Sequence, residues 1–176
     1  MIVIFTLGFD VKFQLRSLVK RTKDVEKVVI VGEFNDARAK NALEALVNFL
    51  GTINVPHETI GVNLHDFQDM VVKVARYLLS NPEKEFLANL SGGMRSLTLA
   101  VLSAFLLTGV DAEVEIETED FATVYTFRVK DISPLSTPLT KDHIEVLKAI
   151  YEGFNSTGSI QQKSWNTVNY NLEKAK

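Results

Sequence analysis

The fold is decided by one stretch of sequence, Asn89–Leu90–Ser91–Gly92–Gly93–Met94–Arg95–Ser96. An apolar run, residues 86–88, leads into it, and a longer apolar segment, residues 97–107, follows it. This order predicts a β-strand, a tight glycine turn and an α-helix. At such a junction the helix presents unpaired backbone N–H groups and the positive end of its dipole. We therefore predict a phosphate-binding turn. The alternative is a capped, buried helix behind a glycine turn that binds no ligand.

The residue types of this turn suit an anion. Gly92 and Gly93 let a ligand approach the backbone closely, because neither carries a Cβ. Ser91 adds a hydroxyl donor, and Arg95 adds a fixed positive charge. Local positive charge and backbone amides have to hold the anion, since the net charge of the whole chain is −3.

Upstream of this stretch, short apolar runs alternate with amphipathic segments. Strands are predicted at 2–5, 26–32, 55–62 and 85–89, and helices at 11–21, 37–50, 66–79 and 94–108. In the first helix, the apolar residues at 11, 15, 18 and 19 are expected to face the core. Asn35 or Asp36 is predicted to cap the second helix, and Gly51 to end it. Pro56 and Gly61 place the third strand towards a sheet edge.

Residues 112–130 show a different pattern, in which apolar and charged residues alternate. This alternation predicts a β-hairpin with a short acidic turn. The acidic residues at 113–120 are expected to form a solvated edge that discourages strand addition. Alternating strands and helices followed by a hairpin predict an α/β sandwich with a mixed sheet.

Length and composition limit the classes of protein that are possible. The 176 residues suffice for one domain and a small appendage, and 46% of them are hydrophobic. Cysteine is absent, which excludes disulfides and thiolate metal sites. The first residues resemble a strand rather than a signal peptide, and polar residues interrupt the longest apolar segment. We therefore expect a cytoplasmic protein without a membrane partner.

Several catalytic motifs are missing from the sequence. No G-x-x-x-x-G-K-[ST] loop occurs, no G-x-G-x-x-G follows the first strand, and no G-x-S-x-G elbow is present. The three histidines, His57, His65 and His143, have no metal-ligand spacing. We therefore assign no catalytic residue, no metal and no cofactor.

Two motifs together resemble the CARF domain, the CRISPR-associated Rossmann-like fold. The first is Thr6–Leu7–Gly8–Phe9–Asp10 after the first strand, with Phe13 and Arg16 behind it, and the second is the stretch from Asn89 to Arg95. The resemblance covers residues 1–131. It implies an α/β, Rossmann-like three-layer sandwich with a mainly parallel sheet and a C-terminal β-hairpin. It also implies a homodimer whose two sensor domains share one cyclic oligoadenylate, usually cyclic tetra-adenylate, across the two-fold axis.

The expected ligand pocket combines these two loops. A two-fold dimer presents each loop twice, so a symmetric ligand meets two glycine turns and two helix N-termini. The predicted pocket residues are Leu7, Gly8, Phe9, Asp10, Ser91, Gly92, Gly93, Met94 and Arg95, with Asn35 and Arg38 as outer candidates.

After a predicted linker at 132–139, residues 140–176 resemble, more loosely, the winged helix-turn-helix of archaeal CRISPR-associated transcriptional regulators. Asn and Thr side chains can reach base edges, and lysines suit phosphates. The interval from 160 to 164 is too short for a middle helix with its turn, and no β-wing follows Lys176. The α-helical module is therefore either reduced or only partly covered by this sequence. The predicted DNA contacts are Lys163, Ser164, Trp165, Asn166, Thr167, Asn169, Tyr170 and Lys174.

The function implied by this resemblance is a transcriptional regulator that senses the cyclic nucleotide and binds double-stranded DNA at CRISPR-associated promoters. Two alternatives stay open at this point. One is a metal-independent ring nuclease that cleaves the cyclic ligand in the same pocket. The other is a CARF adaptor whose helical tail only dimerises.

Overall fold

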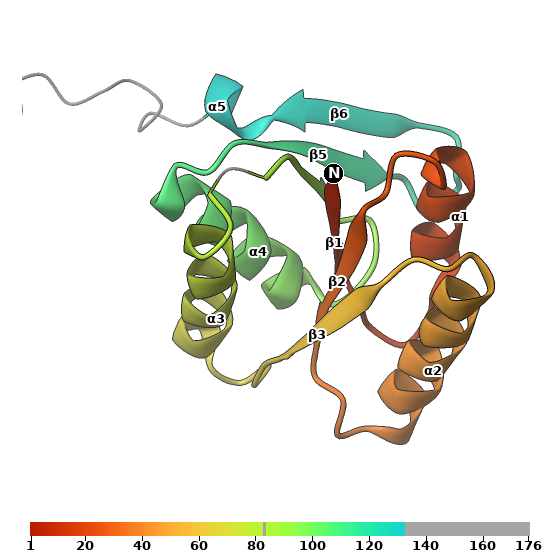
Figure 1. Cartoon of the computed structure of the whole chain (residues 1–176). Helices are drawn as coiled ribbons and strands as arrows, with labels where there is room; N and C mark the ends of the chain where they lie inside the picture. Colours follow the sequence, from red (N-terminus) through yellow and green to blue (C-terminus); the bar gives the residue numbers. More distant parts are fainter. Residues whose placement is uncertain (83, 133–176) are drawn as a thin grey trace, which may run out of the picture. The chain divides into compact units, whose positions relative to one another are not determined.

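The computed structural model describes residues 1–82 and 84–132, and all structural statements below concern these ranges. The chain forms a sheet with helices on both faces (Figure 1). In chain order the elements are β1 (Ile2–Thr6), α1 (Lys12–Arg21), β2 (Lys27–Gly32), α2 (Ala37–Thr52), β3 (His57–Gly61), α3 (Phe67–Leu79), β4 (Phe86–Asn89), α4 (Arg95–Thr108), β5 (Ala112–Glu117), β6 (Val124–Arg128) and α5 (Val129–Ile132).

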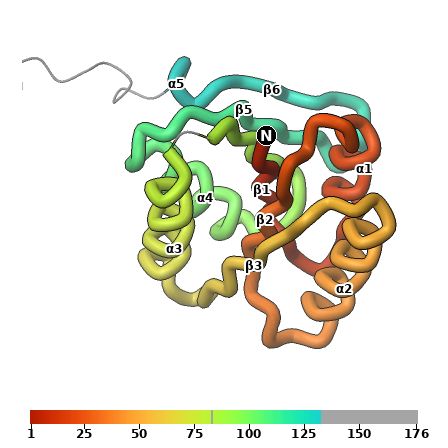
Figure 2. Tube along the Cα trace, viewed as in Figure 1, coloured from red at the N-terminus to blue at the C-terminus, as the bar shows by residue number. Residues whose placement is uncertain are grey.

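The strands form one sheet in the order β3-β2-β1-β4-β5-β6. The pairs from β3 to β5 are parallel, and β6 runs antiparallel to β5. The chain first builds outward from β1 to β3 and then returns through α3 to place β4 on the other side of β1, as the trace in Figure 2 shows. The predicted fold class is confirmed, including the hairpin and the position of β3 at an edge.

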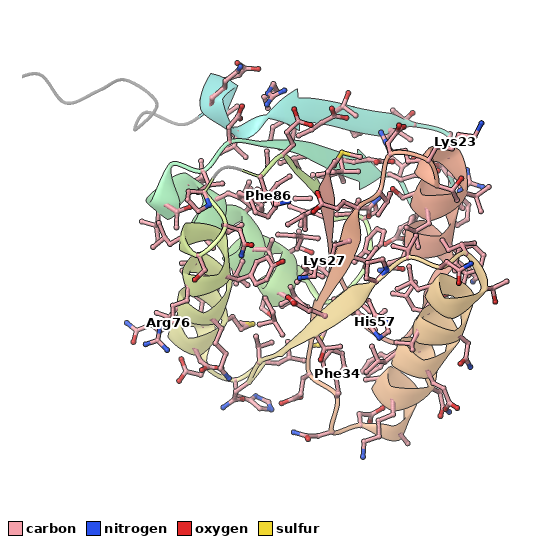
Figure 3. All side chains as sticks on the ribbon, viewed as in Figure 1. Lys23, Lys27, Phe34, His57, Arg76 and Phe86 are labelled. Carbon is pink, nitrogen blue, oxygen red and sulfur yellow. The ribbon has the colours of Figure 1, made fainter. Side chains whose placement is uncertain are left out.

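Helices cover both faces of the sheet, which explains why β1 and β2 are almost continuously apolar. α1 and α2 lie on one face, and α3 and α4 lie on the other (Figure 1). Under α3 and α4, Phe86 packs edge-on against Phe105 with 5.9 Å between ring centroids. Figure 3 shows Phe86 inside the molecule and Arg76 of α3 pointing away from it. Burial of each side chain of this size stabilises the folded state by about 1.5–3 kcal/mol.

The inward face of α1 differs from the prediction. Val19 was expected in the core but is 65% exposed, whereas Gln14 and Ser17 are buried beside Leu18. The reason is the surface below the helix, where β4 and β5 present polar side chains. α1 turns its polar residues towards that surface.

The predicted solvated acidic edge is wrong at two positions for the same reason. Glu115 and Glu117 are only 1% and 4% exposed. β5 is an inner strand between β4 and β6, and its glutamates pair with basic residues of α1. Beyond them, Glu119 and Asp120 are exposed in the hairpin turn, as expected.

Two element ends also differ from the prediction. Gly51 does not end α2, which continues to Thr52. β6 ends at Arg128, and the following residues, Val129–Ile132, form the short helix α5 instead of continuing the strand. Of the two residues predicted to cap the start of α2, Asp36 does so: it accepts a hydrogen bond from the Arg38 N–H. At the start of α3, Asp66 accepts one from the Asp69 N–H.

No helix in the described ranges has the length and apolar character that crossing a membrane requires.

A pair of glycine substitutions tests the new assignment of Gly51. A Cβ on Gly51 would meet nothing within 4 Å. We expect Gly51→Ala to stabilise the protein by about 0.5–1 kcal/mol, because alanine is the better residue inside a helix. Gly109 ends α4 with a φ of 69°, so Gly109→Ala is expected to destabilise by about 1 kcal/mol. Urea unfolding measures both, and destabilisation by Gly51→Ala would contradict the helical assignment.

Candidate functional site

The carboxyl ends of β1 and β4 lie side by side at the centre of the sheet. The two strands pair in parallel, with Phe5 opposite Asn89. The loop from Leu7 to Asp10 and the turn from Leu90 to Met94 therefore leave the sheet together. The strand order reverses at this point, since β2 lies on one side of β1 and β4 on the other. In open α/β sheets, ligands bind in the crevice outside such a reversal.

Glycines bring the two loops into backbone contact. A Cβ built on Gly8 would lie 3.1 Å from the Gly93 Cα. Gly93 itself has a φ of +88°, and a Cβ there would lie 3.0 Å from the Thr6 Cβ. Any larger residue at Gly93 would combine an unfavourable backbone conformation with a close contact. The two motifs identified in the sequence thus form one continuous surface.

Buried polar side chains fix this contact from below. The Gln14 Nε2 donates a hydrogen bond of 2.7 Å to the Thr6 carbonyl, and the Thr6 hydroxyl donates to the Gly92 carbonyl. Gln14 and Thr6 are both fully buried. A Cβ on Gly92 would collide with the amide of Gln14. The first turn of α1 therefore holds the end of β1 and the glycine turn together.

Ser91 is held by β5. The Glu117 N–H donates a 2.8 Å hydrogen bond to the Ser91 Oγ, and the Ser91 N–H donates to the Asn89 Oδ1 at 3.2 Å. Because the Ser91 oxygen accepts a hydrogen bond, its own hydroxyl proton can donate to a ligand. The sequence predicted a donor here but not the contact with Glu117.

α4 begins at the turn without a side-chain cap. Met94 occupies the N-cap position in an extended conformation, and its side chain makes no capping hydrogen bond. Met94 is 42% exposed, and Arg95 is the first residue of the helix and is also exposed. The first turn of α4 thus combines N–H donors, the positive end of a helix dipole and a guanidinium.

Phe9 and Arg38 form an exposed stack next to the glycine contact. The Arg38 guanidinium carbon lies 4.1 Å from the centroid of the Phe9 ring, and Phe9 is 49% exposed. The Arg38 Nε also lies 3.3 Å from the Asp36 Oδ1. The hydrogen bond from the Arg38 backbone N–H lowers the pKa of Asp36, so this carboxylate remains charged in mildly acidic solution. Asn35 is exposed in the same loop.

The two ends of the first loop have different environments. Leu7 is only 4% exposed and packs in the core under α1 and α2, so its backbone is the part near the crevice. Asp10 is exposed, and its carboxylate lies 2.9 Å from the Lys12 Nζ. The hydrogen bond from the Lys12 ammonium lowers the pKa of Asp10, which is therefore negatively charged at neutral pH.

A family model, the Csa3 CRISPR-associated Rossmann-like domain (Csa3_N), matches residues 1–128. The chain belongs to this family. The family assignment confirms the resemblance to CARF domains, and it applies to the part of the chain that carries both loops.

Solved structures with the fold of this Csa3 domain include proteins in complex with cyclic nucleotides. Can2 from Sulfobacillus thermosulfidooxidans, in complex with cyclic tetra-adenylate, has a TM-score of 0.59 at 13% identity, covering 99% of this chain and 57% of that one. Csm6 from Enterococcus italicus, bound to cyclic hexa-2′-fluoro-hexa-dAMP, has a TM-score of 0.54 at 10% identity, covering 98% and 54%. Protein VC1899 from Vibrio cholerae has a TM-score of 0.52 at 12% identity, covering 99% and 58%.

These similarities show the fold alone, because the identities are low. The chain spans a little over half the length of each of these three structures. Among curated proteins, none matches the chain by sequence.

The Csa3 domain also contains site residues that sequence reasoning missed. Thr6, Gln14 and Glu117 hold the two loops in place, yet none of them was among the predicted pocket residues, and Glu117 was predicted to lie on the solvated edge. The sequence does not show that Gln14 lies on the buried face of α1, so its contact with Thr6 could not be predicted. The predicted DNA contacts, Lys163 to Lys174, lie outside the described residues. Within the ranges 1–82 and 84–132, no group of three His, Cys, Asp or Glu side chains could hold a metal ion.

A substitution at Gly93 tests the backbone contact. We expect Gly93→Ala to lower the free energy of unfolding by about 1–3 kcal/mol, because alanine is strained at this φ and crowds Thr6. Gly61→Ala is the matched control, since a Cβ there meets nothing within 4 Å. Chemical denaturation compares the two variants, and equal effects would contradict the proposed constraint at Gly93.

Proposed function

We propose that this Csa3 domain binds a cyclic oligoadenylate, with cyclic tetra-adenylate as the first candidate, in the crevice between the Leu7–Asp10 loop and the Ser91–Arg95 turn. The observation that carries the proposal is the contact of Gly8 with Gly93. It places two loops and the uncapped start of α4 side by side, at the point where the strand order reverses. The folds shared with Can2 and Csm6, whose structures contain cyclic nucleotides, support the choice of ligand.

Phosphate binding is assigned to the α4 side of the crevice. The helix N-terminus contributes only about 0.3–1 kcal/mol per nearby anion. Arg95 therefore supplies the main attraction, since a hydrogen bond to a charged group is worth about 1.5–3 kcal/mol. The Ser91 hydroxyl and the Gly93 backbone N–H add neutral donors beside it.

Base and ribose binding are assigned to the β1 side. Phe9 presents an exposed ring on which an adenine can stack, and Arg38 covers part of that ring. The Asp10 carboxylate would repel a phosphate. It instead suits a hydrogen-bond donor, such as a ribose hydroxyl or an adenine amino group.

A homodimer completes the site in this proposal, so that one cyclic ligand contacts two copies of the crevice. The surface of α4 supports this arrangement. Its only charged residue is Arg95, while Leu99 and Leu107 are 57% and 67% exposed. Leu99 lies one turn after Arg95 on the same face of the helix. An exposed apolar face that continues from the crevice is suited to a second copy of the chain.

Calorimetry with cyclic tetra-adenylate tests ligand binding. The wild-type protein is expected to bind, and Arg95→Ala is expected to weaken binding about 10- to 100-fold through loss of a charge-assisted contact. Arg76→Ala is the matched control, because Arg76 is an exposed arginine on α3 (Figure 3). Absence of binding by the wild-type protein, or equal loss in both variants, would contradict the proposal.

The homodimer is tested by sedimentation velocity. We expect Leu99→Glu to shift the protein from dimer to monomer, because the glutamate would place a charge in the apolar contact. Val19→Glu is the matched control, since Val19 is an equally exposed aliphatic residue on α1. A dimer that survives Leu99→Glu would exclude this face as the interface.

The same protein and ligand samples also distinguish between a transcriptional regulator, a ring nuclease and an adaptor. Our leading proposal is a transcriptional regulator in which the CARF-like domain, residues 1–131, is joined by a linker at 132–139 to a DNA-binding module at 140–176. Ligand-dependent retardation of promoter DNA would support it. Linear adenylate products would instead indicate a ring nuclease. If neither DNA retardation nor cleavage is observed, the adaptor function remains.

A further inference from the structure

A polar layer lies between α1 and the sheet, where an apolar core is usual. On the sheet it consists of Asn89, Glu115 and Glu117, and on the helix of Gln14 and Ser17. All five side chains are buried, with exposures between 0% and 4%. A buried carboxylate is costly unless it is paired and hydrogen-bonded. The contacts of the two glutamates therefore determine where α1 can lie.

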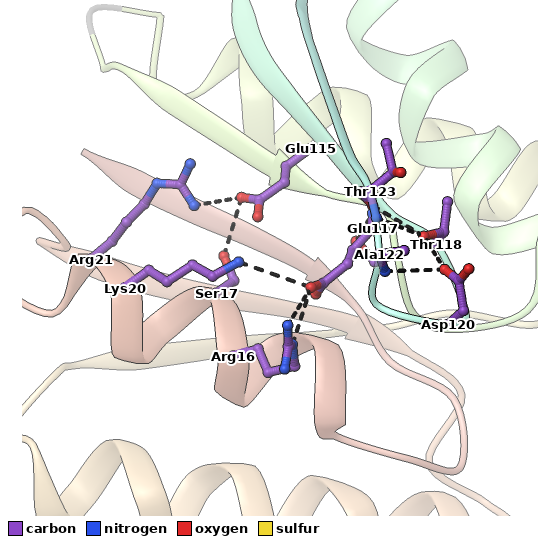
Figure 4. Close-up of polar contacts among 11 residues, drawn as sticks. Arg16, Ser17, Lys20, Arg21, Glu115, Glu117, Thr118, Asp120, Ala122 and Thr123 are labelled. Carbon is purple, nitrogen blue, oxygen red and sulfur yellow. Dashed lines mark hydrogen bonds and ion pairs between the residues drawn. The ribbon is translucent and has the colours of Figure 1, made fainter.

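Each glutamate contacts two side chains of α1 that lie four residues apart, as Figure 4 shows. The Glu117 Oε1 accepts hydrogen bonds from the Arg16 Nε at 3.1 Å and the Arg16 Nη2 at 2.8 Å. Besides Arg16, the Glu117 Oε1 lies 3.9 Å from the Lys20 Nζ. The Glu115 Oε2 accepts from the Arg21 Nη1 at 2.5 Å and from the Ser17 Oγ at 3.3 Å. The hydrogen bonds to the Glu117 carboxylate come from Arg16, and the shortest one to the Glu115 carboxylate comes from Arg21, the last residue of α1.

Arg16 also connects to the hairpin turn. Its guanidinium carbon lies 4.6 Å from the centroid of the Phe121 ring. That ring packs against Phe13 of α1 with 5.2 Å between centroids. Phe121 has a φ of 59°, an uncommon conformation for a bulky residue. The turn between β5 and β6 is therefore fitted closely over the same end of α1.

Glu117 touches the glycine turn as well. Its backbone N–H donates to the Ser91 Oγ at 2.8 Å. The same residue therefore holds Ser91 through its backbone and Arg16 through its side chain. The Ser91 turn and the Leu7–Asp10 loop form the two sides of the crevice.

We infer that Glu117 is a positioning residue of the nucleotide crevice: it aligns the Ser91 turn with the start of α1, and it links both to the β5–β6 turn. This inference rests on the proposed function, because the ligand is taken to bind in that crevice. Glu115 is equally buried, and its backbone carbonyl accepts a 2.9 Å hydrogen bond from the Leu90 N–H, but its carboxylate contacts Ser17 and Arg21 instead of Arg16. A glutamine keeps the backbone hydrogen bond at either position, so the two substitutions differ only in the side-chain contacts that they change. Glu115 therefore serves as the matched control.

The first experiment compares Glu117→Gln with Glu115→Gln in the full chain, using cyclic tetra-adenylate as the probe. Glu117→Gln is expected to weaken binding about tenfold and Glu115→Gln less than about twofold, within the range of couplings between contacting residues. Both should lower the melting temperature, because each removes a buried carboxylate that pairs with basic residues of α1. Equal effects on affinity would overturn the inference.

A milder pair covers the case in which the glutamine variants do not fold. Arg16→Lys and Arg21→Lys keep the positive charge but lose the planar fork of the guanidinium. Arg16→Lys is expected to weaken binding about five- to tenfold and Arg21→Lys less than about twofold, by the same reasoning on coupled contacts. A larger effect of Arg21→Lys would overturn the inference.

The second experiment needs no ligand. The Arg16 Nε–H, which donates to Glu117, gives its own proton resonance by NMR. Ser91→Ala is expected to shift this resonance and to speed hydrogen exchange of the Glu117 amide. Ser91→Thr keeps the hydroxyl and should restore both. An Arg16 resonance that does not respond to Ser91→Ala would overturn the link from the turn to α1.

The two experiments separate the inference from the proposed function. If the wild-type protein binds no cyclic tetra-adenylate, the proposed function fails, and the response of Arg16 to Ser91→Ala still decides whether Glu117 couples the two loops. If the wild-type protein binds and Glu117→Gln binds equally well, the proposed function stands and the positioning role fails.

Discussion

The parallel pairing of β1 with β4 is the interaction on which the rest of the structure depends. It places two loop starts next to each other at the middle of the sheet, and only glycine allows the two backbones to come as close as Gly8 and Gly93 do. The helices that follow these loops, α1 and α4, cover opposite faces of the sheet (Figure 1). One contact between glycines thus sets the relation between two helices and the crevice at their starts.

The contacts that hold α1 on the sheet differ in kind from those that hold the other helices. Under α3 and α4, and under α2, the core is apolar and non-directional. Under α1, hydrogen bonds and ion pairs fix the geometry, because a carboxylate tolerates few positions of its partner. Such networks add little net stability compared with apolar packing, but they define orientation. The helix that carries one side of the crevice is therefore positioned by directional contacts.

Much of this arrangement follows from the sequence. The glycines of both motifs, the strand-turn-helix order around Ser91 and the hairpin are local patterns, and local patterns predicted them correctly. The side chains between elements were not predicted, because periodicity counts polarity and assumes that the inward face is apolar. Gln14, Glu115 and Glu117 break that assumption, since all three are polar and buried. The two glutamates pair with arginines 94 and 101 positions away in the chain, and Gln14 donates to the Thr6 carbonyl. The end of α2 was misplaced because glycine often ends a helix, whereas Gly51 lies inside α2.

The strand order has a consequence for folding. β1, β2 and β3 are neighbours both in sequence and in the sheet, so their pairing closes shorter connections than the pairing of β1 with β4 does. The contact between Thr6 and Gly92 joins residues 86 positions apart and forms only when β4 reaches β1. Closing so long a loop costs entropy before any contact repays it. On this reasoning we expect the contact between the two loops to be among the last parts of the domain to form, and a ligand bound across both loops would select chains whose folding is complete.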